Sequence, residues 1–96
     1  AGASLSYESK SLEMGMISIR PNPANGRITV QAASIPSTDL VWQIMDVSGR
    51  LVLEGNWMAS KSDQLEISLD RLSPGTYQLS VIGTQYFGSE RFVIDR

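Results

Sequence analysis

The sequence predicts an all-β fold, an antiparallel β-sandwich built from about seven strands. Apolar and polar side chains alternate with a period of two in one segment after another, which is typical of strands with one buried face. Turn-forming residues, chiefly glycine, proline, asparagine and aspartate, interrupt these segments about every 8–12 residues. No segment carries the apolar spacing of a helix. Together these observations favour two packed sheets without a helical layer.

The first predicted strand, residues 16–20, follows a small and polar stretch, residues 1–14, which we interpret as a linker with room for one short pairing segment. The proline-containing segment 21–26 ends this strand, because proline fixes φ and removes a backbone donor. The Asn-Gly pair that closes the segment favours a turn, since both residues tolerate positive φ. Residues 27–32 then alternate as the second strand.

The middle of the chain predicts a hairpin. Residues 40–47 are the most apolar segment and are expected to form a central strand, with residues 51–54 as its partner. In the turn between them, the Asp46 carboxylate can accept hydrogen bonds from backbone N–H groups two residues on, and Gly49 suits a positive φ. Residues 55–63 are interpreted as a polar connection that leaves the sheet.

Three more strands are expected in the last third of the chain. Residues 64–70 alternate with one polar face, residues 76–82 follow a tight turn at 72–75, and residues 86–94 form the last strand, with a candidate bulge at Gly88. The side chains expected in the core are Ile28, Val30, Trp42, Ile44, Val52, Leu65, Ile67, Leu69, Tyr77, Leu79, Val81 and Phe92.

Composition limits the classes of function. The 96 residues fit one domain with a modest core. Eight basic and ten acidic residues give a net charge of −2 and the basic residues are scattered, so a nucleic-acid partner is not expected. The absence of cysteine and histidine removes disulfides, the usual zinc ligands and the commonest general base. No apolar run approaches the roughly 20 residues of a membrane span and no glycine-rich phosphate cradle occurs, so no membrane-spanning segment, metal or cofactor is expected.

Candidate catalytic groups have simpler interpretations. A serine–lysine pair would have to use Lys10 or Lys61, and both lie in polar stretches expected to be exposed. Four carboxylates that could pair for glycoside hydrolysis fall on polar strand faces or at strand ends, namely Glu54, Asp63, Glu66 and Asp70. We therefore predict a domain that is not an enzyme.

The aromatic side chains leave a second kind of function open. Trp42 and Tyr77 lie in strong core patterns, whereas the sequence does not place Trp57 or Tyr86. An exposed Trp57 beside Tyr86 would indicate a sugar-stacking surface. The alternative function is therefore an immunoglobulin-like accessory module that binds carbohydrate or spaces a cell-surface adhesin.

Four segments carry a resemblance to a known family: residues 19–24 (IRPNPA), 44–52 (IMDVSGRLV), 69–81 (LDRLSPGTYQLSV) and 91–94 (RFVI). In this order and at this spacing, the chain resembles the type A C-terminal sorting domain of the type IX secretion system, also called Por secretion, of Gram-negative Bacteroidetes. The resemblance covers residues 15–96, which we expect to form the sorting domain behind the linker.

The resemblance implies a seven-stranded immunoglobulin-like sandwich fused behind a cargo domain, with no catalytic activity. The implied partners are the outer-membrane translocon and the sortase or attachment-complex proteins of the type IX system. The implied route passes through the periplasm to the outer-membrane surface or the extracellular space. In many relatives a sortase removes the domain and joins the cargo to anionic lipopolysaccharide.

By this resemblance, the residues of the sorting motif are Pro21, Asn22, Pro23, Asp46, Gly49, Gly75, Tyr77 and Leu79. Those of the C-terminal translocation signal are Arg91, Phe92, Val93, Ile94, Asp95 and Arg96. Many members end in a lysine-rich strand, whereas Asp95 dilutes the positive charge here, which fits a member that stays attached to a component of the machinery. An exposed last strand would also offer an edge for strand addition by a partner.

Overall fold

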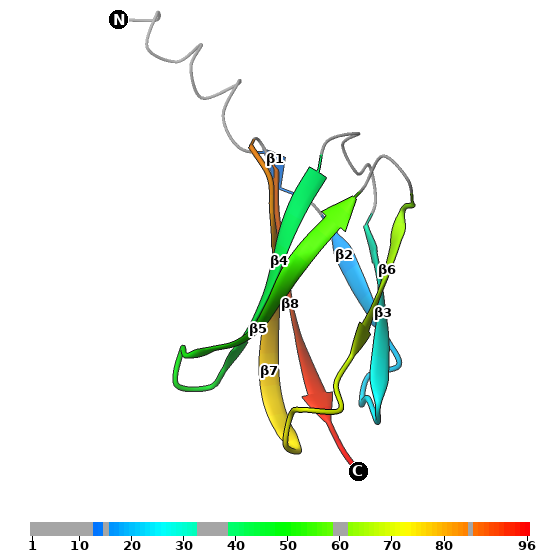
Figure 1. Ribbon diagram of the computed structural model, residues 1–96, viewed down its shortest axis with the longest axis vertical. Helices are drawn as coiled ribbons and strands as arrows, with labels where there is room; N and C mark the ends of the chain where they lie inside the picture. Colours follow the sequence, from blue (N-terminus) through cyan, green and yellow to red (C-terminus); the bar gives the residue numbers. More distant parts are fainter. Residues whose placement is uncertain (1–12, 15, 33–38, 59–61, 85) are drawn as a thin grey trace, which may run out of the picture.

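Two β-sheets pack face to face in the computed structural model, which describes residues 13–14, 16–32, 39–58, 62–84 and 86–96 (Figure 1). One sheet has the strand order β1-β8-β7-β4-β5 and the other β2-β3-β6. Strands β2 to β8 pair antiparallel, which confirms the predicted seven-stranded immunoglobulin-like sandwich. The strands are β1 (Glu13–Met14), β2 (Ile17–Arg20), β3 (Arg27–Ala32), β4 (Asp39–Asp46), β5 (Leu51–Met58), β6 (Gln64–Ser68), β7 (Gly75–Ile82) and β8 (Tyr86–Ile94).

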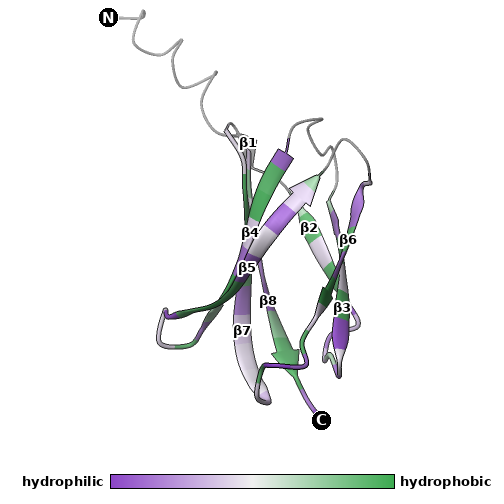
Figure 2. Ribbon diagram, in the orientation of Figure 1, coloured by the Kyte–Doolittle hydropathy of each residue, from purple (hydrophilic) through white to green (hydrophobic). Residues whose placement is uncertain are grey.

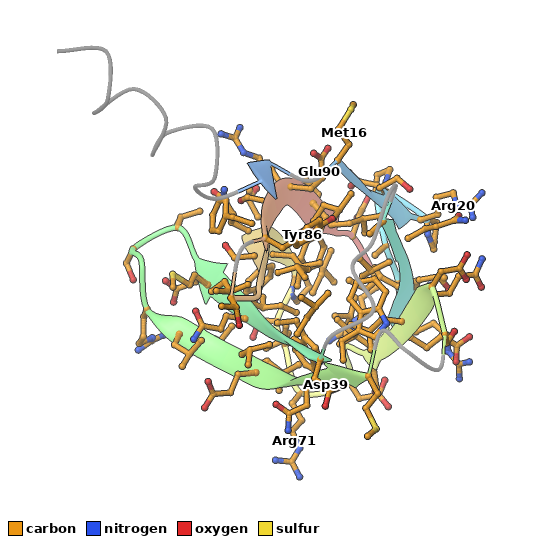
Figure 3. All side chains as sticks on the ribbon, turned by 90° about the horizontal axis from the view of Figure 1, so that it is seen from above. Met16, Arg20, Asp39, Arg71, Tyr86 and Glu90 are labelled. Atoms are coloured by element: carbon orange, nitrogen blue, oxygen red, sulfur yellow. The ribbon has the colours of Figure 1, made fainter. Side chains whose placement is uncertain are left out.

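The core lies between the two sheets and follows the period-two pattern of the sequence, because successive side chains of a strand point to opposite faces. Figure 3 shows Tyr86 inside the ring of strands, whereas Met16, Arg20 and Arg71 project outward. Three of the predicted core side chains are only partly buried against the core: Trp42, Val52 and Leu65. The other nine are buried as predicted: Ile28, Val30, Ile44, Ile67, Leu69, Tyr77, Leu79, Val81 and Phe92.

The strand β5 is longer than predicted, and this corrects the interpretation of residues 55–63 as a connection that leaves the sheet. Residues 55–58 continue the ladder with β4, and Gly55 pairs with Trp42. A Cβ atom on Gly55 would lie 2.6 Å from the Trp42 ring, so this glycine makes room for an indole and does not form a turn.

The bulge predicted at Gly88 is wrong. Gly88 pairs regularly with Val81 in an unbroken ladder between β7 and β8. The register shifts instead in the β4–β5 pair, where Ile44 faces Leu53 but Met45 faces Leu51. One extra residue in β5 therefore enters the hairpin arm next to the turn.

The strand β1 adds to the edge of β8, where Glu13 pairs in parallel with Tyr86, and Met14 with Phe87. The short pairing segment allowed for in the linker is thus present, while residues 1–12 lie outside the described part. In the described residues, no helix is long and apolar enough to cross a membrane.

Candidate functional site

The end of β8 is held by the proline-containing turn between β2 and β3. The Asn22 side-chain amide donates to the Arg91 carbonyl (3.3 Å), and its oxygen accepts from the Val93 N–H (3.1 Å). A single side chain therefore occupies the place of a neighbouring strand, because it satisfies both a donor and an acceptor on the outer edge of β8. The peptide bonds before Pro21 and Pro23 are both cis.

The backbone of Ala24 continues this pairing. The Ala24 N–H donates to the Val93 carbonyl (2.7 Å), and the Asp95 N–H donates to the Ala24 carbonyl (2.8 Å), in a parallel bridge between Ala24 and Ile94. Both of these apolar residues are 1% exposed. The end of the last strand is thus not the open edge that the sequence suggested, because this turn covers it. We call the segment 21–24 the clamp.

Arg96 connects the end of the chain to two turns. Its guanidinium donates to the carbonyls of Asn25 (2.9 Å), Leu69 (3.3 Å) and Leu72. These carbonyls lie in the turns that follow β2 and β6 of the three-stranded sheet, at the end of the sandwich where β8 finishes (Figure 1). Arg96, which follows β8 of the five-stranded sheet, therefore links the two sheets. The neighbouring Asp95 side chain is exposed.

The aromatic pair beneath the clamp comes from adjacent strands. Tyr77 of β7 stacks on Phe92 of β8 with ring centroids 5.8 Å apart, and its hydroxyl donates to the Ser73 carbonyl (2.6 Å). Gly75, which pairs with Ile94, has a φ of 154°, a conformation that favours glycine. The hydrophobic end of β8 in Figure 2 is therefore fixed from inside as well as from its edge.

The β4–β5 turn is organised by one carboxylate. The Asp46 Oδ1 accepts from the Ser48 N–H (3.0 Å), the Ser48 hydroxyl (2.6 Å) and the Arg50 N–H (3.0 Å). The hydrogen bonds from the Ser48 hydroxyl and the Arg50 N–H, with smaller contributions from the Ser48 N–H and the Arg50 charge, together lower the pKa of Asp46 below its ordinary value and outweigh the opposing effect of desolvation. Gly49 takes a φ of 87°, as predicted. The Asp46 carboxylate is thus engaged within its own turn by two backbone N–H groups and by the side chains of Ser48 and Arg50.

A shallow groove of about 750 Å³ joins this turn to β7 and β8 on the outer face of the five-stranded sheet. Four of the predicted site residues line it, namely Asp46, Gly49, Tyr77 and Arg91. Sequence reasoning missed its other lining side chains, although those on β7 and β8 have the outward parity of their strands: Met45, Val47, Thr76, Gln78, Ser80, Phe87 and Ser89.

The predicted site residues thus fall into three places. Residues 21–23 and the end of β8 form the clamp region, and Asp46 and Gly49 belong to the groove. Leu79, predicted for the sorting motif, is fully buried in the core and packs there.

The aromatic residues that the sequence left open are both interior. Trp57 is 2% exposed and its indole N–H donates to the Ser62 carbonyl (3.0 Å). Tyr86 is 2% exposed as well. Because Trp57 and Tyr86 are both buried, they do not form the exposed pair that would have indicated a sugar-stacking surface.

The other candidate groups lie apart. Glu66 forms an exposed ion pair with Arg27 (3.6 Å), and the side chains of Glu54, Asp63 and Asp70 are exposed. Within the described residues, no three metal-ligating side chains of the His, Cys, Asp or Glu type gather in one place. Lys10 and Lys61 lie outside the described residues.

Comparison with known proteins identifies the family to which most of this chain corresponds. A family model described as a secretion system C-terminal sorting domain matches residues 18–95. The match runs from β2 to the residue after β8 and includes both the clamp and the groove. A search of curated proteins found no match.

Proposed function

Because this chain belongs to the family of secretion system C-terminal sorting domains, we propose that it carries no chemistry of its own and directs the protein that bears it through the type IX machinery. Its partners are then the outer-membrane translocon and the sortase or attachment-complex proteins. The route leads through the periplasm to the outer-membrane surface or the extracellular space.

The observation that carries this proposal is the joining of the opening motif to the terminal segment. Asn22 reaches β8 across 69 and 71 residues of sequence, and Arg96 reaches Asn25 across 71. A receptor that binds this end of the sandwich contacts both motifs at once. The signal is therefore a surface of the folded domain, not a linear peptide.

An export assay tests the proposal. Residues 1–96 are fused behind a signal peptide and a reporter, and the fusion is expressed in a type IX-competent host and in a translocon-null strain. We expect reporter at the surface or in the medium of the competent strain only. Reporter held in the periplasm of both strains would reject the sorting function.

Cleavage and transfer to anionic lipopolysaccharide form a separate part of the proposal. Glu13 and Met14 are already paired with β8, so we expect a sortase to cut on the N-terminal side of Glu13. Mass spectrometry of the mature protein locates the junction. An intact junction would instead identify a member that stays attached to a component of the machinery, which is the interpretation that the acidic Asp95 favours.

A further inference from the structure

We propose that the groove lined by Arg91 holds an extended segment of a machinery protein, and that a carboxylate in this segment pairs with the Arg91 guanidinium. This inference rests on the proposed sorting function and names the chemistry of one contact within it. The groove is shallow and follows a sheet face, so it fits an extended chain better than a compact ligand.

The side chains of the groove suit an uncharged backbone and an apolar side chain. Thr76, Gln78 and Ser80 of β7 supply hydroxyl and amide groups, and no residue of β7 is charged. Met45 and Phe87 supply apolar walls on the two neighbouring strands. An extended segment can therefore exchange hydrogen bonds along β7 while its apolar side chains contact these walls.

The charges of the groove specify the rest of the occupant. Two charged residues line it, and the Asp46 carboxylate is already engaged by Ser48 and Arg50. The ion pairs of the described residues are Arg27–Glu66 and Arg50–Asp46, so Arg91 has no internal anion among them. Arginine binds anionic groups such as carboxylates through two parallel hydrogen bonds, and in a segment of a protein the complementary anion is the carboxylate of Asp or Glu.

The opposite face of the sandwich, on the three-stranded sheet, offers no such unpartnered cation among the described residues of its strands. On the three-stranded sheet, Arg27 pairs with Glu66 and the Arg20 guanidinium donates to Gln31 (3.2 Å). Arg27 thus has an anionic partner and Arg20 a neutral hydrogen-bond partner on that sheet, whereas the Arg91 guanidinium has neither among the described residues. The Arg91 side of the molecule is therefore the better candidate for binding an external anion.

Photocrosslinking in cells tests this inference. A benzophenone amino acid replaces Thr76 in the groove or Thr29 on the opposite sheet, two half-buried threonines that differ in face. In the competent strain we expect a crosslink from position 76 and none from position 29, and the captured peptide contains Asp or Glu. Equal crosslinking from both positions, or a peptide without an acid, overturns the inference.

A charge exchange completes the test. Arg91→Glu should lower the crosslink and the exported reporter at least about tenfold, while Arg71→Glu, at an exposed turn residue, leaves both unchanged. Replacement of the captured acid by arginine should then restore both the crosslink and the export of the Arg91→Glu variant. Thermal unfolding of the purified variants verifies that they remain folded.

The two proposals fail in different ways. Normal export of a folded Arg91→Glu variant overturns the groove inference and leaves the sorting function standing. Failure of the exchange to restore export also overturns it. Loss of export for the unaltered domain in the competent strain overturns both.

Discussion

At the scale of single residues, Asn22 replaces a missing strand neighbour with one side chain. Its two hydrogen bonds to β8 are exposed, and each such bond contributes on the order of 0.5–1.5 kcal/mol net. We expect Asn22→Ala to lower the free energy of unfolding by about 1 kcal/mol, the lower end of the sum for two bonds, because water can replace exposed hydrogen bonds. Urea denaturation measures the loss, and hydrogen exchange should show faster exchange of the Val93 amide.

The matched control is Asn56→Ala, because Asn56 is an exposed asparagine in β5, at the opposite edge of the same sheet. We expect the free energy of unfolding of that variant, and its exchange rate at the Val93 amide, to stay close to those of the unaltered domain. If both asparagine variants behave alike, the clamp does not hold β8.

Asp46 gives the β4–β5 turn a dependence on pH. Its pKa is lowered in the folded state, so the stabilisation is fully present above the ordinary aspartate pKa of about 3.9 and is lost as pH falls through the lower folded value. We expect the Ser48 and Arg50 amide resonances to titrate together, with a midpoint below that of an unstructured aspartate. A midpoint at or above the ordinary value would contradict the hydrogen-bond pattern.

Residue chemistry could be predicted where the partners are local. The Asp46 turn and the positive φ of Gly49 depend on neighbours within four residues, and both follow from the sequence. The partners of Asn22 and Arg96 lie up to 71 residues away, and no local pattern encodes such a distance. The family resemblance named these residues but did not say that they meet.

At the scale of elements, Gly55 explains why β5 could not be predicted in full. Glycine and asparagine in residues 55–56 indicate a turn, yet this glycine lies under the Trp42 ring. The alternation in β3, β7 and β8 was sufficient, because the buried side chains of each of these strands all lie on one face. An edge strand such as β5 has fewer buried side chains and so a weaker pattern.

This contact predicts a cost for Gly55→Ala. The new methyl group would lie 2.6 Å from a ring atom of Trp42, so the partly buried indole must shift. Overpacking of this kind costs about 1–3 kcal/mol. Thermal or urea unfolding measures it, with Gly26→Ala as the control, since the nearest atom there is at an ordinary 3.8 Å. A Gly55→Ala domain as stable as the control would disprove the close packing.

At the scale of the whole molecule, the segment assigned as the translocation signal is also part of the core. Phe92 is 0% exposed and Ile94 is 1% exposed. Loss of one large core side chain costs about 3–5 kcal/mol, against a total stability of about 5–15 kcal/mol for a domain. We expect removal of residues 91–96 to unfold the domain, as seen by near-ultraviolet circular dichroism.

Export lost on that truncation would therefore not locate the signal, because unfolding alone accounts for it. Substitution of the exposed Arg91 side chain separates recognition from folding. A truncated domain that keeps its near-ultraviolet spectrum would show that the core does not depend on β8.

The place of β8 in the sandwich has a consequence for incomplete chains. This strand lies between β7 on one side and β1 and the clamp on the other, and it also presents Arg91 to the groove. A product of interrupted translation or proteolysis that lacks this strand has neither a closed core nor the surface that a receptor would bind. We therefore expect copies that lack β8 to be left out of export, so that the presence of a complete, folded domain reports that the chain before it was completed.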